Sequence, residues 1–268
     1  MYPQIHLHVL ASGSKGNATL VEGPDGFVLV DCGISNRELA RRAAELGLDL
    51  GRVRAVLLTH EHGDHTRGLP VFAKRFDGPL FATAGTVGAR KDLTGLAFSI
   101  VDHSCALDLA GMRVRAFPTS HDVADPMCFR FETDDDAVGY CTDTGVLTTE
   151  ALDLLFGARI LALESNHDAK MLASGPYPAY LKARVGGEKG HLSNDQAAEA
   201  LRDLVDEDTE TVVAMHLSQE NNRPSVCVRA LAEAVGAVAA DDAWTEARTP
   251  DGLLSICAAA QDWPMTVW

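Results

Sequence analysis

The sequence lacks any long apolar run and any signal for export. No stretch approaches the roughly 18 consecutive apolar residues of a membrane helix, although 46% of the 268 residues are hydrophobic. The first residues do not contain a basic region followed by an apolar segment, so we expect no signal peptide. These absences favour a cytoplasmic protein that makes no use of a membrane.

Closely spaced cysteine pairs are missing too. The six cysteines are scattered, and none belongs to a C-x-x-C pair: Cys32, Cys105, Cys128, Cys141, Cys227 and Cys257. This spacing favours reduced, mostly structural thiols in a cytosolic protein. Linkers, repeats and low-complexity segments are likewise absent, and the length suits a single domain over residues 1–268.

Positive charge is scarce. The formal net charge of −15 predicts that the general field of the protein does not attract nucleic acid. An anionic substrate would therefore need a local excess of positive charge. The segment from Lys170 to His191 offers such an excess. It contains one acidic residue, Glu188, and four basic residues: Lys170, Lys182, Arg184 and Lys189. A solvated basic loop is the alternative interpretation.

Short apolar runs and turn signals predict the order of elements. Strands are expected over residues 5–10, 18–22, 27–31, 53–58, 112–117, 127–132, 137–141, 160–163 and 211–215. Helices are expected over residues 36–46, 148–156, 194–205 and 224–235, and the tail is expected to add one or two strands. Strands in runs with interspersed helices predict an α+β protein, in which two sheets are covered by helices on both outer faces, four layers in all.

Three imidazoles and two carboxylates follow one of these strands within six residues. They lie in Thr59-His60-Glu61-His62-Gly63-Asp64-His65, directly after the apolar strand over residues 53–58. Neutral imidazole and carboxylate ligands suit Zn²⁺, Mn²⁺ or Fe²⁺. A solvated loop that happens to be rich in histidine is the alternative, but the spacing directly after a strand favours a metal site.

Polar side chains also follow five other strands. The segments are Asp31-Cys32-Gly33, Ser120-His121-Asp122, Thr142-Asp143-Thr144-Gly145, Glu164-Ser165-Asn166-His167 and His216-Leu217-Ser218. Each alone has an ordinary explanation as a helix cap, a turn or a packed histidine. If the strands end at one edge of the sandwich, these segments build a single site.

The ligand-type residues together resemble those of the metallo-β-lactamase superfamily. The matching residues are His60, His62, Asp64, His65, His121, Asp143 and His216. The motifs Ser12-Gly13-Ser14-Lys15-Gly16-Asn17, Gly190-His191-Leu192-Ser193-Asn194 and His216-Leu217-Ser218-x-x-Asn221-Asn222 resemble those of its WalJ/YycJ branch more specifically. The resemblance implies a four-layer αβ/βα sandwich, the metallo-β-lactamase fold, with a dinuclear metal centre.

The resemblance also implies a distribution of ligands. One metal ion would bind His60, His62 and His121, the other would bind Asp64, His65 and His216, and Asp143 would bridge the two. Zn²⁺ is the expected ion, with Mn²⁺ or Fe²⁺ as alternatives. An oxygen ligand at Asp143, where lactamases of the superfamily often have cysteine, fits the phosphoesterase members better.

The same resemblance implies a hydrolase that cleaves phosphodiester bonds, with a DNA exonuclease as the expected form. Asp64, His191 and Glu164 are the expected catalytic residues, because His191 resembles a phosphate-contacting histidine and Glu164 could hold it protonated. Substrate contacts are expected from Lys182, Arg184, Lys189 and Asn222. The alternatives are a small-molecule hydrolase acting on a cyclic phosphodiester, thioester or lactone, a redox protein and a non-catalytic metal scaffold.

Overall fold

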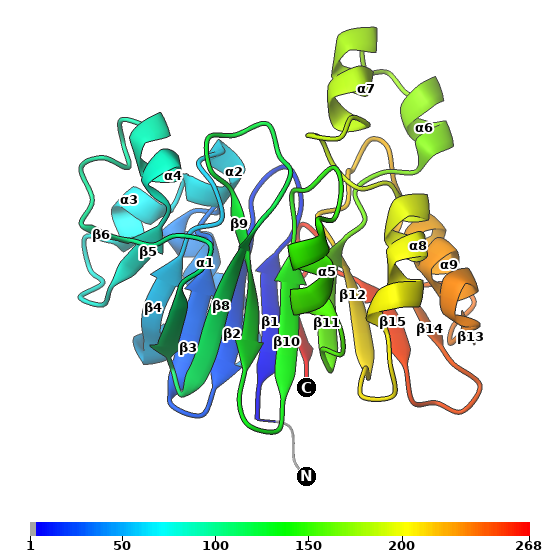
Figure 1. Cartoon of the computed structure of the whole chain (residues 1–268), viewed down its shortest axis with the longest axis horizontal. Helices are drawn as coiled ribbons and strands as arrows, with labels where there is room; N and C mark the ends of the chain where they lie inside the picture. The colour runs from blue at the N-terminus through cyan, green and yellow to red at the C-terminus, as the bar shows by residue number, and fades with distance from the viewer. Residues whose placement is uncertain (1–3) are drawn as a thin grey trace. The chain divides into compact units, whose positions relative to one another are not determined.

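The computed structural model describes residues 4–268, and the contacts among these residues divide them into two units. The first unit comprises residues 4–118, Val123–Asp136 and Ala260–Trp268. The second comprises Thr119–Asp122 and Ala137–Ala259. Each unit has its own strands and helices, coloured along the chain in Figure 1. That residues 1–268 form a single domain stays a prediction.

The first unit contains a seven-stranded sheet. Its strands, in spatial order, are β16 (Met265–Val267), β1 (His6–Ala11), β2 (Ala18–Gly23), β3 (Gly26–Val30), β4 (Val53–Leu57), β5 (Leu80–Ala82) and β6 (Phe98–Ile100). Antiparallel pairing joins β16, β1, β2 and β3, and parallel pairing joins β3 to β6. The predicted opening meander is thereby confirmed. Its two-residue turn, Pro24-Asp25, connects the paired residues Gly23 and Gly26.

The helices of the first unit are short except for α1. They are α1 (Asn36–Glu45), η1 (Leu50–Arg52), α2 (Gly63–Thr66), α3 (Leu69–Phe72) and α4 (Ala84–Ala89). The predicted helix over residues 36–46 is confirmed: Ser35 caps it through Glu38 N, and Leu39 and Ala43 are buried in the core. Gly47 follows its C-cap with a φ of +73°, a conformation that glycine adopts without strain.

Three further strands of the first unit pair antiparallel. They are β7 (Ala106–Leu109), β8 (Met112–Pro118) and β9 (Met127–Glu132). The acidic triplet Asp134–Asp136 follows β9, and a bend is formed there. The carboxylate of Asp136 accepts hydrogen bonds from the backbone nitrogens of Gln4 and Ile5.

The second unit contains a set of strands that pair side by side. In spatial order they are β13 (Val238–Ala239), β14 (Glu246–Arg248), β15 (Ser255–Ala258), β12 (Thr211–Met215), β11 (Ile160–Glu164) and β10 (Ala137–Cys141). Pairing is parallel from β10 to β15 and antiparallel from β15 to β13. Every residue of β10 and β11 is buried, which explains their continuous apolar sequences.

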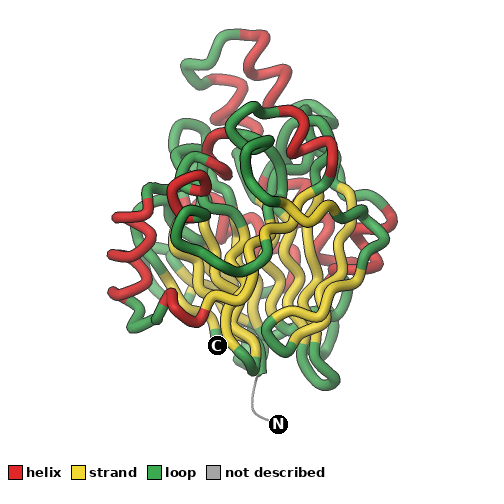
Figure 2. The backbone as a smooth tube through the Cα atoms, turned by 90° about the vertical axis from the view of Figure 1, so that its left-hand side faces the viewer, coloured by secondary structure: helices red, strands yellow, loops and turns green. Residues whose placement is uncertain are grey.

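Five helices complete the second unit. They are α5 (Thr149–Leu155), α6 (Ala169–Ser174), α7 (Ala179–Val185), α8 (Asn194–Leu204) and α9 (Pro224–Val235). The predicted helix over residues 194–205 is confirmed, and Ser193 and Gln196 form a capping box at its start. Helices α8 and α9 pack together, and α9 contacts β14 and β15. Helices α6 and α7 project beyond the ends of β11 and β12, as both Figure 1 and Figure 2 show.

The long strands and helices agree with the sequence prediction, and the short ones were not anticipated. The unpredicted elements are β5, β6, β7, α2, α3, α4, α6 and α7. The expected one or two strands in the tail were too few, because β13 to β16 all follow α9. Among residues 4–268, no helix has the length and hydropathy needed to cross a membrane.

A buried arginine ties α1 to the end of the chain within the first unit, and its loss should be costly. Arg42, only 5% exposed, donates from Nη1 to the carbonyls of Leu10 (3.0 Å) and Gln261 (2.6 Å). We expect Arg42→Ala to lower the free energy of unfolding by about 2–4 kcal/mol, because two buried acceptors lose a charged donor. Urea denaturation measures this change.

The neighbouring Arg41 is the matched control, since it pairs only with Glu38 and Glu45 at the surface. Arg41→Ala should change the free energy of unfolding by less than about 0.5 kcal/mol. Equal effects of the two substitutions would contradict the role assigned to Arg42.

Candidate metal centre

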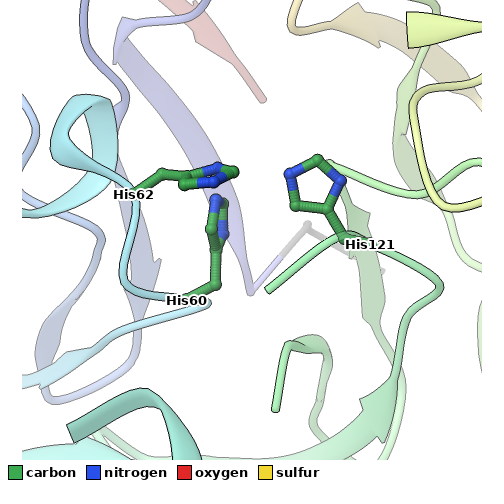
Figure 3. Close-up of side chains that lie close together, drawn as sticks. All are labelled: His60, His62 and His121. Carbon is green, nitrogen blue, oxygen red and sulfur yellow. The ribbon is translucent and has the colours of Figure 1, made fainter. Parts of the chain in front are cut away.

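The first ligand cluster follows β4 in the first unit and consists of His60, His62, Asp64 and His65. Four of the five residues of β4 are buried, and the chain then turns into α2, with His62 at its N-cap. Figure 3 shows the rings of His60 and His62 turned toward each other, with centroids 4.9 Å apart and an interplanar angle of 79°. The ring of His65 lies 4.1 Å from that of His60. The predicted histidine-rich loop therefore brings its imidazoles together within this unit.

Asp31, at the end of β3, holds this cluster in place. Its carboxylate is fully buried and accepts hydrogen bonds from Thr59 N (2.9 Å), from the Thr59 hydroxyl and from His65 Nδ1 (2.7 Å). A carboxylate only accepts, so the proton of the His65 ring lies on Nδ1. The opposite nitrogen, Nε2, is then the one whose lone pair can bind a metal.

Thr59 fixes the ring of His60 in a similar way. Its hydroxyl donates to Asp31, so its oxygen accepts from His60 Nδ1, which lies 3.0 Å away. The sequence placed Asp31 among the polar residues at strand ends that could build one site, but it assigned a role in the site to neither Asp31 nor Thr59.

The glycine- and serine-containing loop over residues 12–17 packs against the histidine-rich loop. The backbone nitrogen of Asn17 donates to Asp64 O (2.7 Å), and Asn17 Nδ2 donates to His65 Nε2 (2.9 Å), the nitrogen that a metal ion would take over. Gly33 lies between these loops, where an added Cβ would come within 1.6 Å of Asp64 O. Glycine is therefore required at this close approach.

The second ligand cluster lies in the second unit and consists of His121, Asp143, Glu164, His191 and His216. Asp143, Glu164, His191 and His216 each offer a ligand atom, and these atoms lie within 4.8 Å of one another. They come from the ends of β10, β11 and β12 and from the segment before α8. Asp143 and His216 have φ values of +58° and +56°. The structure thus gathers residues that are distant in the sequence, as predicted.

Glu164 organises the second cluster. Its side chain is fully buried, and Oε1 accepts hydrogen bonds from Nδ1 of His191 (2.8 Å) and of His216 (3.0 Å). Oε2 accepts from the backbone nitrogens of Thr144 and Leu192. Burial alone would raise the pKa of Glu164, but charge on His191 and the hydrogen bonds from both imidazoles outweigh it and lower this pKa. Glu164 is therefore an anion that orients two imidazoles.

His121 is held in a similar way. Its Nδ1 donates to the carbonyl of Gly190 (3.0 Å), and its Nε2 lies 3.8 Å from Asp143 Oδ1. Its ring centroid is 5.0 Å from that of His191. Burial lowers the pKa of His121, which favours the neutral imidazole that binds metals.

Three buried amides support the loops that carry these residues. Asn166 Nδ2 donates to His216 O (2.8 Å), and Asn194 Nδ2 donates to Asn222 Oδ1 (3.0 Å). Asn222 is 4% exposed, and its Nδ2 donates to the carbonyls of Ser165 and Asn166. The substrate contact of Asn222 stays a prediction. Its hydrogen bonds in the structure are those of a residue that supports loops.

The predicted basic residues lie on or near α7. Lys182 Nζ donates to Ala173 O (2.6 Å), and Arg184 forms an ion pair with Asp122. Lys189 is exposed. Their contacts with substrate stay predictions. His167 is buried, and its carbonyl accepts from Asn194 N in front of α8.

The donors present fit divalent metal ions. They are imidazoles and carboxylates, the ligand types that Zn²⁺, Mn²⁺ and Fe²⁺ share. In four of the histidines an oxygen atom accepts a hydrogen bond from Nδ1, so Nε2 is the nitrogen suited to a metal. These are His60, His65, His121 and His216. The identity of the ion stays a prediction.

Comparisons with known proteins agree with this arrangement. The sequence profile of the family described as beta-lactamase superfamily domain matches residues 27–217. The exodeoxyribonuclease YycJ of Bacillus anthracis is 35% identical over 81% of this chain and 84% of its own. The exodeoxyribonuclease WalJ of Streptococcus pneumoniae strain D39 is 33% identical over 80% of this chain and 82% of its own.

A solved structure shows the same fold. The metallo-β-lactamase fold protein YhfI of Bacillus subtilis superimposes with a TM-score of 0.69 and 13% identity, covering 98% of this chain and 100% of the other. The predicted fold class, the α+β metallo-β-lactamase fold, is confirmed. The resemblance to the WalJ/YycJ branch and the prediction of a metal-dependent hydrolase are confirmed as well.

The buried carboxylate of Asp31 should control metal affinity without touching the metal. In Asp31→Asn the side chain keeps its size, and asparagine tolerates the φ of +59° found here. The ring of His65 nevertheless loses its anionic acceptor. We expect metal affinity to fall by about 10- to 100-fold, measured by competition with a chromogenic chelator.

Asp25→Asn, in the exposed turn before β3, is the control and should bind metal like the wild type. Unchanged affinity in the Asp31→Asn protein would show that its carboxylate does not orient a ligand.

Proposed function

Because the chain belongs to the metallo-β-lactamase superfamily, we propose that it is a dinuclear metal-dependent phosphodiesterase that degrades DNA from an end. Two relatives that span most of the chain are named exodeoxyribonucleases, which supports DNA as the substrate. The observation that carries the proposal is the Glu164–His191 pair beside Asp143 and His216. It places a proton donor, His191, beside two residues of metal-ligand type, Asp143 and His216.

The proposed centre uses the ligand set that the family resemblance implies. His60, His62 and His121 would hold one ion, Asp64, His65 and His216 the other, and Asp143 would bridge them. Two divalent ions bound there would lower the pKa of a water molecule and neutralise charge on the phosphoryl oxygens. Such a reaction needs no protein nucleophile, which agrees with the burial of Cys32, Cys128 and Cys141.

His191 has the geometry of a general acid for the leaving oxygen. Its Nδ1 donates to Glu164, so its Nε2 is the atom that can give a proton to the substrate. The hydrogen bond to the anionic Glu164 keeps the ring from rotating. After the P–O bond breaks, the proton that leaves His191 Nε2 would neutralise the released alkoxide.

A small-molecule hydrolase is the second candidate. The net charge of −15 favours it, because a long polyanion is repelled by the general field of the protein. The ion pair of Arg184 with Asp122 also neutralises one of the predicted substrate contacts. A cyclic phosphodiester, a thioester or a lactone would carry less charge into the site.

A substrate panel separates these candidates. We expect the metal-loaded protein to hydrolyse labelled DNA ends faster than bis-p-nitrophenyl phosphate, RNA, a thioester or a lactam, with Zn²⁺ or Mn²⁺ added. Asp64→Ala is the blank and should lose both bound metal, by elemental analysis, and hydrolysis. Faster cleavage of the thioester or the small diester than of DNA would favour the second candidate.

The role of His191 can be separated from metal binding. His191→Ala should keep its metal content and lose about 10²- to 10⁴-fold in the rate of phosphodiester cleavage, the usual contribution of a general acid. Substrates with a good leaving group, such as p-nitrophenolate, should lose much less, because they need no proton. His103→Ala is the control, since among residues 4–268 this histidine pairs only with Asp125. Near-normal DNA cleavage by His191→Ala would remove it from the mechanism.

A further inference from the structure

A hollow of about 700 Å³ lies in the first unit, away from the first ligand cluster. Its walls come from α1, α3, the segment before β5 and the first residues of β4, Val53 and Arg54. The first ligand cluster follows the last residue of β4, so the hollow lies toward the opposite end of this strand. Cavities of about 300–1,000 Å³ are typical of small-molecule sites.

One wall of the hollow is aromatic. Phe72 and Phe76 both line it, and their ring centroids lie 5.2 Å apart with planes tilted by 35°. Both rings are half-buried and pack on the core of the first unit, beside the buried Leu39. A pair of fixed rings beside an open space favours a flat, apolar ligand.

Charged groups also line the hollow. Two arginines, Arg54 and Arg75, are among its lining residues in a protein of net charge −15, and Asp77 is the acidic residue beside them. Arg54 uses its Nε to donate to Asp25 O (3.0 Å). The side chain of Arg75 makes no hydrogen bond or ion pair with any residue from 4 to 268. Planar guanidinium groups are well suited to a phosphate.

Asn36 adds an uncommitted amide to the lining. Within residues 4–268 its side chain makes no hydrogen bond, and its Oδ1 is a buried acceptor that lacks a donor. Buried polar atoms without partners are rare in proteins and call for an explanation. An amide offers both an acceptor oxygen and a donor nitrogen to a ligand.

We propose that this hollow binds a nucleoside monophosphate. The base would stack on Phe72 and Phe76, and the phosphate would pair with Arg75 and Arg54. The sugar hydroxyl would donate to Asp77, and Asn36 would hydrogen-bond to the edge of the base. A nucleotide has the three features that these residues would bind: a flat aromatic base, a phosphate dianion and neutral hydrogen-bond donors. The site is separate from the metal centre and does not depend on the function proposed above.

Isothermal titration calorimetry of the purified protein with dAMP and with AMP tests the proposal. We expect the wild type to bind at least one of them with a Kd below about 1 mM. Arg75→Glu should weaken binding about tenfold or more, because a charge-assisted contact with phosphate is replaced by repulsion. Lys74→Glu makes the same change of charge at an exposed neighbour outside the lining and should bind like the wild type.

Further variants assign the binding to this hollow. Asp64→Ala, which is expected to lose metal, should still bind the nucleotide, and Arg75→Glu should hydrolyse bis-p-nitrophenyl phosphate like the wild type. Binding lost in Asp64→Ala and kept in Arg75→Glu would place the nucleotide at the metal centre and overturn the proposal. Equal affinity for inorganic phosphate and dAMP would also overturn it, since the aromatic wall would then contribute nothing. The same applies if no nucleotide binds at millimolar concentration.

Discussion

Two buried carboxylates, one in each unit, fix the imidazoles on which the site depends. Asp31 accepts from Thr59 and His65, and Glu164 accepts from His191, His216 and two backbone nitrogens. A buried carboxylate costs several kcal/mol unless hydrogen bonds compensate it. Here each hydrogen bond that offsets this cost also fixes the orientation of an imidazole ring or the position of a loop. Stability of the folded chain and order of the site therefore rest on the same hydrogen bonds.

The backbone contributes a second constraint at the strand ends. Asp31, Asp143 and His216 all have a left-handed conformation, with φ between +56° and +59°. For residues other than glycine this conformation costs roughly 1–2 kcal/mol each. Each of them comes within two residues of the end of a buried strand, where the surrounding hydrogen bonds hold the turn. Backbone strain of this kind persists where the direction of a side chain matters more than local stability. Here the left-handed conformation turns the side chains of these three residues out of the sheet.

The sequence predicted those parts of the fold that local rules determine. The apolar run of β4 and the capping box at Ser193 specify their elements without help from distant residues. Helices α6 and α7 have few buried residues, so their sequence carries little apolar periodicity. At the site, ligand types were visible in the sequence. The supporting role of Asp31 and the burial of Asn222 depend on tertiary hydrogen bonds that spacing cannot show.

Charge is the constraint that links the fold to the proposed substrate. The chain carries −15, and the basic residues near the second cluster are partly engaged, Arg184 by Asp122 and Lys182 by the carbonyl of Ala173. A protein that neutralises few phosphates gains little from counterion release. Attraction of a phosphodiester then has to come mostly from cations within the site, over a range of about one Debye length. This balance favours recognition of one or a few linkages at an end of a strand over a long duplex, which is how an exonuclease meets its substrate.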